Sequence, residues 1–242
     1  MTLWKCSEHF VRKSEENRMK KKNKIQPAMA FSFNSKTEHV FFFKKKGGTM
    51  HFDLDLYKPT ELEKRISYIY RENGILSPSH MDLDKIAFIY DCHVIYSEKP
   101  TMVLYDDAYG GLIFLNAYVT KEQQREDFFH EISHPALHVG CQNTLPELFV
   151  DLQESQAASF QLYSAMPYFM LAAIEPSGYE NEYISQLSDI FQLSFDFVNR
   201  RIEQVQRRIV QGYHDRNTQF RFNNTNPQDH ERQLSIARAI VL

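Results

Sequence analysis

The chain has 242 residues, of which 43% are hydrophobic and 24% are charged, and its formal net charge at pH 7 is −3. This composition excludes a disordered chain and suits one domain of moderate size, or a small domain with extensions. The three cysteines are too few and too far apart for a disulfide framework or a cysteine-based zinc cluster, which favours a reducing, cytoplasmic setting. No apolar run approaches the roughly 18 residues of a membrane span and no signal-peptide pattern is present, so we expect no membrane partner.

Charge separates the first part of the chain from the rest. Residues 1–49 hold 12 of the 28 Lys and Arg residues but 4 of the 31 Asp and Glu residues, a net charge of +8 that leaves −11 for residues 50–242. The stretch KKKGGTM at 44–50 back-translates to a purine-rich ribosome-binding site followed by a start codon. We therefore expect residues 1–49 to be a disordered basic segment or upstream sequence annotated in error; the alternative is a genuine basic arm that binds nucleic acid.

The first half of the remaining chain predicts two helices and a small sheet. Residues 59–74 read as a helix with a capping box of Thr60 and Glu63, and a second helix is expected over 81–91. Three short β-like runs follow at 93–96, 102–105 and 112–116. The turn between the last two contains Asp106, Asp107, Gly110 and Gly111. These runs predict a small antiparallel sheet.

The second half predicts helices only. One begins near Thr120 with Gln123 as capping partner, and another begins near Thr144 and runs to about Tyr163. Two more helices are expected over 175–211, the second with Arg, Gln and Glu on its solvent side, and 212–242 reads as a loose polar tail. The whole is an α+β fold, with a catalytic part over 50–174 and an all-helical C-terminal part.

The chemistry lies in FFHEISHPALH, residues 128–138. On a helix each residue advances about 100°, so His134 lies about 40° from His130, with Glu131 beside them at about 100°. Phe128, Phe129 and Ile132 fall on the opposite side. Two imidazoles on one face can bind one zinc ion, and the glutamate can accept a proton from a water that the zinc activates. The alternative is a helix with incidental histidines, because the H-E-x-x-H pattern alone gives false positives.

A catalytic zinc of this type needs a third protein ligand. The next predicted helix offers Glu147, Asp151 and Glu154 on neighbouring turns. Spacing alone does not choose among these three.

A family resemblance does choose. FFHEISHPALH followed by LQESQAASFQLYSAMP at 152–167 resembles the ImmA/IrrE family of metallo-endopeptidases, whose second helix has the form E-x-x-A-N/D-x-F-A and ends in Met-Pro. Glu154, Ala157, Phe160 and Met166-Pro167 match in order and spacing, and the resemblance covers roughly residues 52–205. It implies a zincin-like domain with Glu154 as the third zinc ligand.

The chain departs from the family pattern at three positions. Ala158 replaces an Asn or Asp that would bond to a ligand histidine, and Gln161 replaces a small residue. Pro135 follows His134 and is expected to kink or end the helix there. His138 lies on the histidine face as well, and we predict a supporting role for it and not a ligand role.

The resemblance also implies a function. We expect a zinc endopeptidase, with Glu131 as catalytic base, that cleaves a helix-turn-helix repressor and so derepresses genes of a mobile element or a stress response. We expect no direct binding to nucleic acid. Two rivals remain open: a non-catalytic regulatory protein on the same fold, and DNA binding through residues 1–49.

Overall fold

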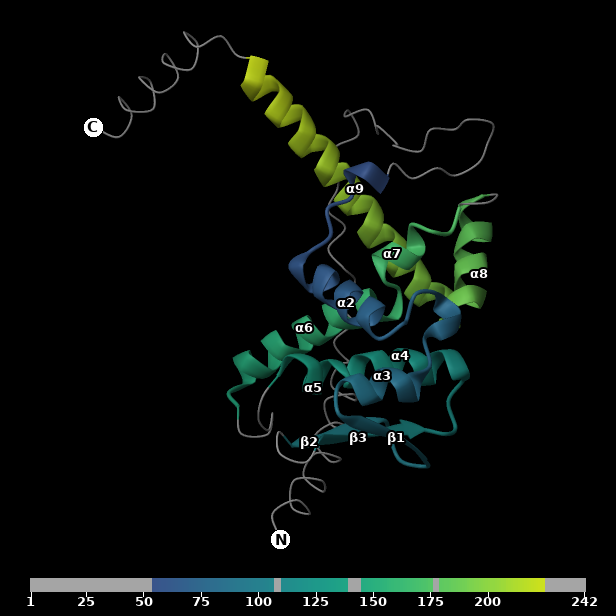
Figure 1. Cartoon of the computed structure of the whole chain (residues 1–242). Coiled ribbons are helices and arrows are strands. Elements are labelled where there is room, and N and C mark those ends of the chain that lie inside the picture. Colours follow the sequence, from purple (N-terminus) through teal and green to yellow (C-terminus); the bar gives the residue numbers. More distant parts are fainter. Residues whose placement is uncertain (1–53, 107–109, 139–144, 176–178, 225–242) are drawn as a thin grey trace, which may run out of the picture.

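The computed structural model describes residues 54–106, 110–138, 145–175 and 179–224, so the predictions for residues 1–49 and the expected cap at Thr144 lie outside the described residues (Figure 1). Within those ranges the elements are η1 (Leu54–Leu56), α2 (Glu61–Glu72), η2 (Pro78–His80), α3 (Leu83–Ile89), β1 (Cys92–Ser97), β2 (Met102–Asp106), β3 (Gly110–Asn116), α4 (Lys121–Glu131), α5 (Ser133–Leu137), α6 (Glu147–Ala165), α7 (Tyr168–Leu171), α8 (Glu180–Phe191) and α9 (Phe195–Asn224). The α+β class is confirmed.

The sheet is mixed, so the prediction of an antiparallel sheet is wrong in one pairing. The strand order is β1-β3-β2; β2 runs antiparallel to β3, but β1 runs parallel to it. The short link after Ser97 crosses over the end of β3, which leaves β3 between the other two strands. Close approach requires glycine here, because a Cβ on Gly110 would lie 2.4 Å from the Asp91 carbonyl oxygen.

The helices form layers on one side of the sheet (Figure 1). α3 packs on β1 and α4 on β3, and α6 lies across α4, α5 and α2. Alternating β3 residues, Ile113 and Leu115, are fully buried beneath them, together with Phe128 and Phe129 of α4. This packing places α4 and α6, which carry the motif residues, against each other.

The C-terminal helices share a core with the rest of the chain. Leu187 of α8 and Val198, Ile202, Val205 and Ile209 of α9 belong to the same buried cluster as the sheet and α4. α9 continues to Asn224, so the prediction of a loose segment from 212 is wrong as far as residue 224. Gly212 allows α9 to pack against η1, because a Cβ at this position would lie 2.0 Å from the Leu56 carbonyl oxygen.

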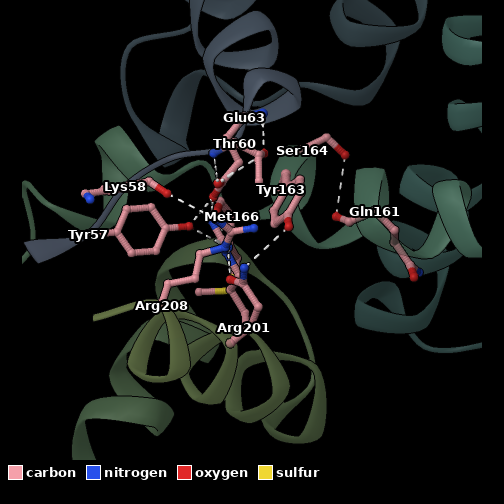
Figure 2. Close-up of polar contacts among 11 residues, drawn as sticks. Tyr57, Lys58, Thr60, Glu63, Gln161, Tyr163, Ser164, Met166, Arg201 and Arg208 are labelled. Atoms are coloured by element: carbon pink, nitrogen blue, oxygen red, sulfur yellow. Dashed lines mark hydrogen bonds and ion pairs between the residues drawn. The ribbon is translucent and has the colours of Figure 1, made fainter. Parts of the chain in front are cut away.

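A buried ion pair joins α9 to α2 (Figure 2). Arg201 is 0% exposed and its Nη2 donates to Glu63 Oε1 at 2.9 Å, while Nε donates to the Met166 carbonyl oxygen at 3.1 Å. Tyr57 donates its hydroxyl hydrogen to the same Glu63 oxygen. Glu63 also completes the predicted capping box with Thr60, which is confirmed. The arginines of this helix were expected as a group on its solvent side, and the burial of Arg201 corrects that prediction at one position.

No helix in the described part of the chain is both long and apolar enough to cross a lipid bilayer.

Candidate metal centre

The predicted break at Pro135 is present. Thr120 caps α4 by accepting from the Gln123 backbone N–H at 3.2 Å, which confirms half of the predicted capping box, whereas the Gln123 side chain bonds to Asp127; the helix ends at Glu131. After Ile132 the chain continues as the short helix α5, which contains His134 and Pro135. Proline has no N–H to donate to the Glu131 carbonyl oxygen, so the hydrogen-bond ladder is interrupted at that point. The two motif histidines therefore stand on separate helices.

The apolar side of this segment holds it in place. Phe128, Phe129 and Ile132 are each 0% exposed, and the rings of the two phenylalanines meet edge to face with centroids 5.3 Å apart. Their burial fixes the orientation of the opposite side, where His130 lies half-buried and His134 is 5% exposed. The predicted division into an apolar face and a histidine face is confirmed.

Three donor groups converge on that side. His130 Nε2 lies 3.4 Å from Glu154 Oε2, and His134 Nε2 lies 3.9 Å from Glu154 Oε1. One ligand atom from each residue lies within 4.8 Å of the others. Two imidazole nitrogens and one carboxylate oxygen are a donor set that suits zinc, and one position remains for water or substrate.

The fold brings one of the three carboxylates of α6 to the two histidines. Only Glu154 belongs to a possible metal-binding group in the described residues, whereas Glu147 and Asp151 are exposed. Gln161, which replaces a small residue of the family pattern, sits two turns further along α6 and donates its amide to the Glu126 carbonyl oxygen at 2.8 Å. That bond ties α6 to α4 and so helps to set the distance between Glu154 and the histidines.

Glu131 is held between the donor group and the sheet. Burial raises the pKa of its carboxyl to about 7, the negative charges of Glu154 and Asp127 add to this, and His130 and a hydrogen bond from the Val103 backbone act in the opposite direction. A carboxyl group that titrates near neutral pH can both accept and return a proton under physiological conditions. Strand β2, which contains Val103, thereby helps to position the predicted base.

The two histidines differ in their electrostatic surroundings. Burial alone would lower the pKa of His130, but the hydrogen bond with Glu154 and the neighbouring carboxylates outweigh it and raise the pKa above its usual value. For His134, burial dominates and lowers the pKa to about 4, despite the attraction of Glu154. His134 is therefore neutral near pH 7, as a metal ligand must be.

The neighbours of the site follow the sequence predictions in part. His138 is buried, and its Nδ1 lies 3.3 Å from His134 Nδ1, which places it behind the donor group and not within it. Asp127 accepts a hydrogen bond from Gln123 at 2.7 Å. Ala158, at the place of the family's Asn or Asp, is exposed and has no side-chain hydrogen-bonding group. The sequence patterns did not identify Gln156, whose Oε1 lies 3.1 Å from His138 Nε2.

Helices that present H-E-x-x-H and a following glutamate beside a small sheet are the framework of a zincin-type metallopeptidase. The family model of Peptidase_M78, the IrrE N-terminal-like domain, matches residues 89–203. The chain belongs to this metallopeptidase family, which confirms the resemblance seen in the sequence.

Two proteins of Bacillus subtilis (strain 168) are similar to the chain. The phage-like element PBSX protein XkdA is 33% identical over 150 residues, which cover 62% of this chain and 75% of XkdA. The uncharacterized protein YqaB is 24% identical over 157 residues, covering 64% of this chain and 90% of YqaB. Among solved structures, a Mycobacterium tuberculosis transcriptional regulator aligns with a TM-score of 0.39 and 14% identity over 57% of this chain and 44% of its own.

Proposed function

We propose that this protein is a zinc-dependent, site-specific endopeptidase that cleaves a helix-turn-helix transcriptional repressor and so derepresses the genes of a mobile element or a stress response. The convergence of His130, His134 and Glu154 beside the half-buried Glu131 is the observation that supports hydrolysis best. Membership of a metallopeptidase family supports the same reaction class.

Each residue has a separate task in this proposal. His130, His134 and Glu154 would hold the zinc ion through Nε2, Nε2 and a carboxylate oxygen. A zinc ion in such a site polarises a carbonyl group and lowers the pKa of water and of nearby carboxyl groups. Glu131 accepts the proton of the attacking water and returns it to the leaving amine. Phe128, Phe129 and Ile132 behind them keep the histidines from turning away from the centre.

The proposed substrate class rests on the family resemblance and on the genetic element to which a similar protein belongs. XkdA is a protein of a phage-like element, which is the setting in which a repressor-cleaving protease would release prophage genes. The net charge of −11 over residues 50–242 would attract a basic DNA-binding protein, since opposite net charges speed encounter.

The rival proposal, a non-catalytic binding protein on the same fold, rested on damage to the zinc site by Pro135 and Ala158. The donor atoms nevertheless lie within 4.8 Å of one another despite the break at Pro135, which favours a metal site that can work.

The experiment is co-expression with the repressor encoded beside the gene, comparing wild type with Glu131→Gln. We expect the wild type to cleave the repressor under inducing conditions and Glu131→Gln to leave it intact. Asp151→Asn is the matched control, because it neutralises an exposed carboxylate on α6 outside the donor group. An intact repressor with all three proteins, in the presence of bound zinc, would support the non-catalytic rival, and equal cleavage by all three would exclude Glu131 as the base.

A further inference from the structure

A hydrogen-bond chain runs outward from the donor group. His134 directs Nε2 toward Glu154 and Nδ1 toward His138, whose Nδ1 lies 3.3 Å away. His138 in turn directs Nε2 toward Gln156 Oε1 at 3.1 Å. His134 and His138 are both buried, with 5% and 7% exposure, so their ring nitrogens are withdrawn from bulk water. The Nδ1 of His134 and both ring nitrogens of His138 therefore contact neighbouring side chains and not bulk water.

The acceptor at the outer end sets the direction of the whole chain. Gln156 directs Oε1 toward His138, and since this oxygen has only lone pairs to offer, the arrangement assigns the hydrogen of His138 to Nε2. A neutral imidazole then has a lone pair on Nδ1, and this lone pair accepts a hydrogen from His134 Nδ1. His134 with its hydrogen on Nδ1 has its lone pair on Nε2, which is the atom that faces Glu154.

We propose that His138 and Gln156 together position His134 and fix its tautomer, and that they replace the outer hydrogen bond that Ala158 cannot make. A histidine ligand normally donates its second ring N–H to a supporting group, and loss of that group weakens metal binding. His138 follows α5 one helical turn after His134, and Gln156 lies two residues after Glu154 on α6, so the support comes from the segments that carry two of the three ligands. This inference rests on the proposed zinc site but not on cleavage.

The test compares two substitutions at one position. His138→Asn retains an acceptor close to the place of Nδ1, whereas His138→Phe retains the ring and removes the acceptor. We expect His138→Phe to weaken zinc binding about 10- to 100-fold in competition with a chromophoric chelator, and His138→Asn to stay close to wild type. His93→Phe, at an exposed histidine on β1, is the matched control and should bind zinc as the wild type does.

A second measurement reads the tautomers directly. Long-range ¹⁵N–¹H correlation spectra of the zinc-free protein should show the hydrogen of His134 on Nδ1 and that of His138 on Nε2. In Gln156→Leu we expect this preference to weaken, because the acceptor at the end of the chain is gone. A purely structural role for His138 would leave the tautomers of His134 unaffected by Gln156.

The outcomes separate this inference from the proposed function. If wild type binds no zinc, the proposed metal site fails. If wild type binds zinc and His138→Phe binds it equally well, the metal site stands and the positioning role is refuted. Equal weakening by His138→Phe and His138→Asn, or a hydrogen on Nε2 of His134 in the wild type, would also overturn the role of His138 as acceptor.

Discussion

Removal of the Arg201 guanidinium should destabilise the protein far more than removal of another guanidinium on the same helix. Arg201→Met retains an unbranched apolar side chain but removes the donors to Glu63 and to the Met166 carbonyl oxygen. Glu63 is 2% exposed and would stay in place as a buried charge without its cation. Breaking a buried pair in this way costs about 3–5 kcal/mol, because the remaining charge has lost its partner and water does not replace it.

Arg207→Met is the matched control. Arg207 lies less than two turns further along α9, and its Nη1 is 3.7 Å from Glu203 Oε2, with both side chains more than half exposed (69% and 51%). A pair that is open to solvent contributes about 0–1 kcal/mol. The structure thus offers two arginines on one helix that each pair with a glutamate; the Arg201 pair is buried and joins α9 to α2, whereas the Arg207 pair is exposed and lies within α9.

The free energies of unfolding should be measured by urea denaturation and the midpoints by heating. For a protein of this size each kcal/mol corresponds to about 2–4 °C, so we expect Arg201→Met to lower the midpoint by roughly 6–20 °C. Adding Glu63→Gln to Arg201→Met should restore part of the loss, because the amide removes the uncompensated charge and still serves the capping box. A loss below about 1 kcal/mol for Arg201→Met, equal to that of Arg207→Met, would refute the reasoning.

Three further predictions concern packing, a thiol and the metal. Gly212→Ala should lower the free energy of unfolding by about 1–3 kcal/mol in urea titrations, although alanine favours helices, because its Cβ would meet the Leu56 carbonyl oxygen at 2.0 Å; a more stable variant would contradict that contact. Burial, aided by the charge of Asp91, raises the pKa of the Cys92 thiol to about 11. In a variant without the other two cysteines, iodoacetamide should therefore label Cys92 about 100-fold more slowly than free cysteine at pH 8. A labelling rate that stops rising at pH 9 would disprove the raised pKa. Zinc at about 100 times its Kd should raise the free energy of unfolding by about 2.7 kcal/mol and EDTA should reverse this, whereas an unchanged unfolding midpoint would argue against the site.

Local sequence signals predicted the elements that carry the site. The capping residues Thr60 and Thr120 fixed two helix starts, and both side chains accept the backbone hydrogen bonds expected of them. The H-E-x-x-H spacing identified His130 and His134, since residues four apart share a helix face. Glu154 could be predicted only with the family resemblance, because spacing alone does not distinguish among the three carboxylates on neighbouring turns.

Features that depend on contacts between distant segments were not predictable. Consecutive strands pair in most sheets, so the insertion of β3 between β1 and β2 had no local signal. Arg201 read as part of a polar helix face, because its buried partner Glu63 lies 138 residues away in the sequence. The polar residues beyond Gly212 read as loose, yet the helix continues through them and side chains one turn apart bond along it: Gln211 donates to Asp215 at 2.8 Å, and Thr218 donates to the His214 carbonyl oxygen at 2.9 Å.

The proline after His134 interrupts the helix without separating the ligands, and the backbone explains why. Ile132, between α4 and α5, has φ −65° and ψ −18°, which lies in the helical region. The chain therefore keeps turning in nearly the same way through the break, although Pro135 contributes no hydrogen bond. His130 and His134 stay about one turn apart, with ring centroids separated by 5.4 Å, and their Nε2 atoms both reach Glu154. The angular arithmetic for an unbroken helix gave the right result because the break removes a hydrogen bond and leaves the direction of the chain nearly unchanged.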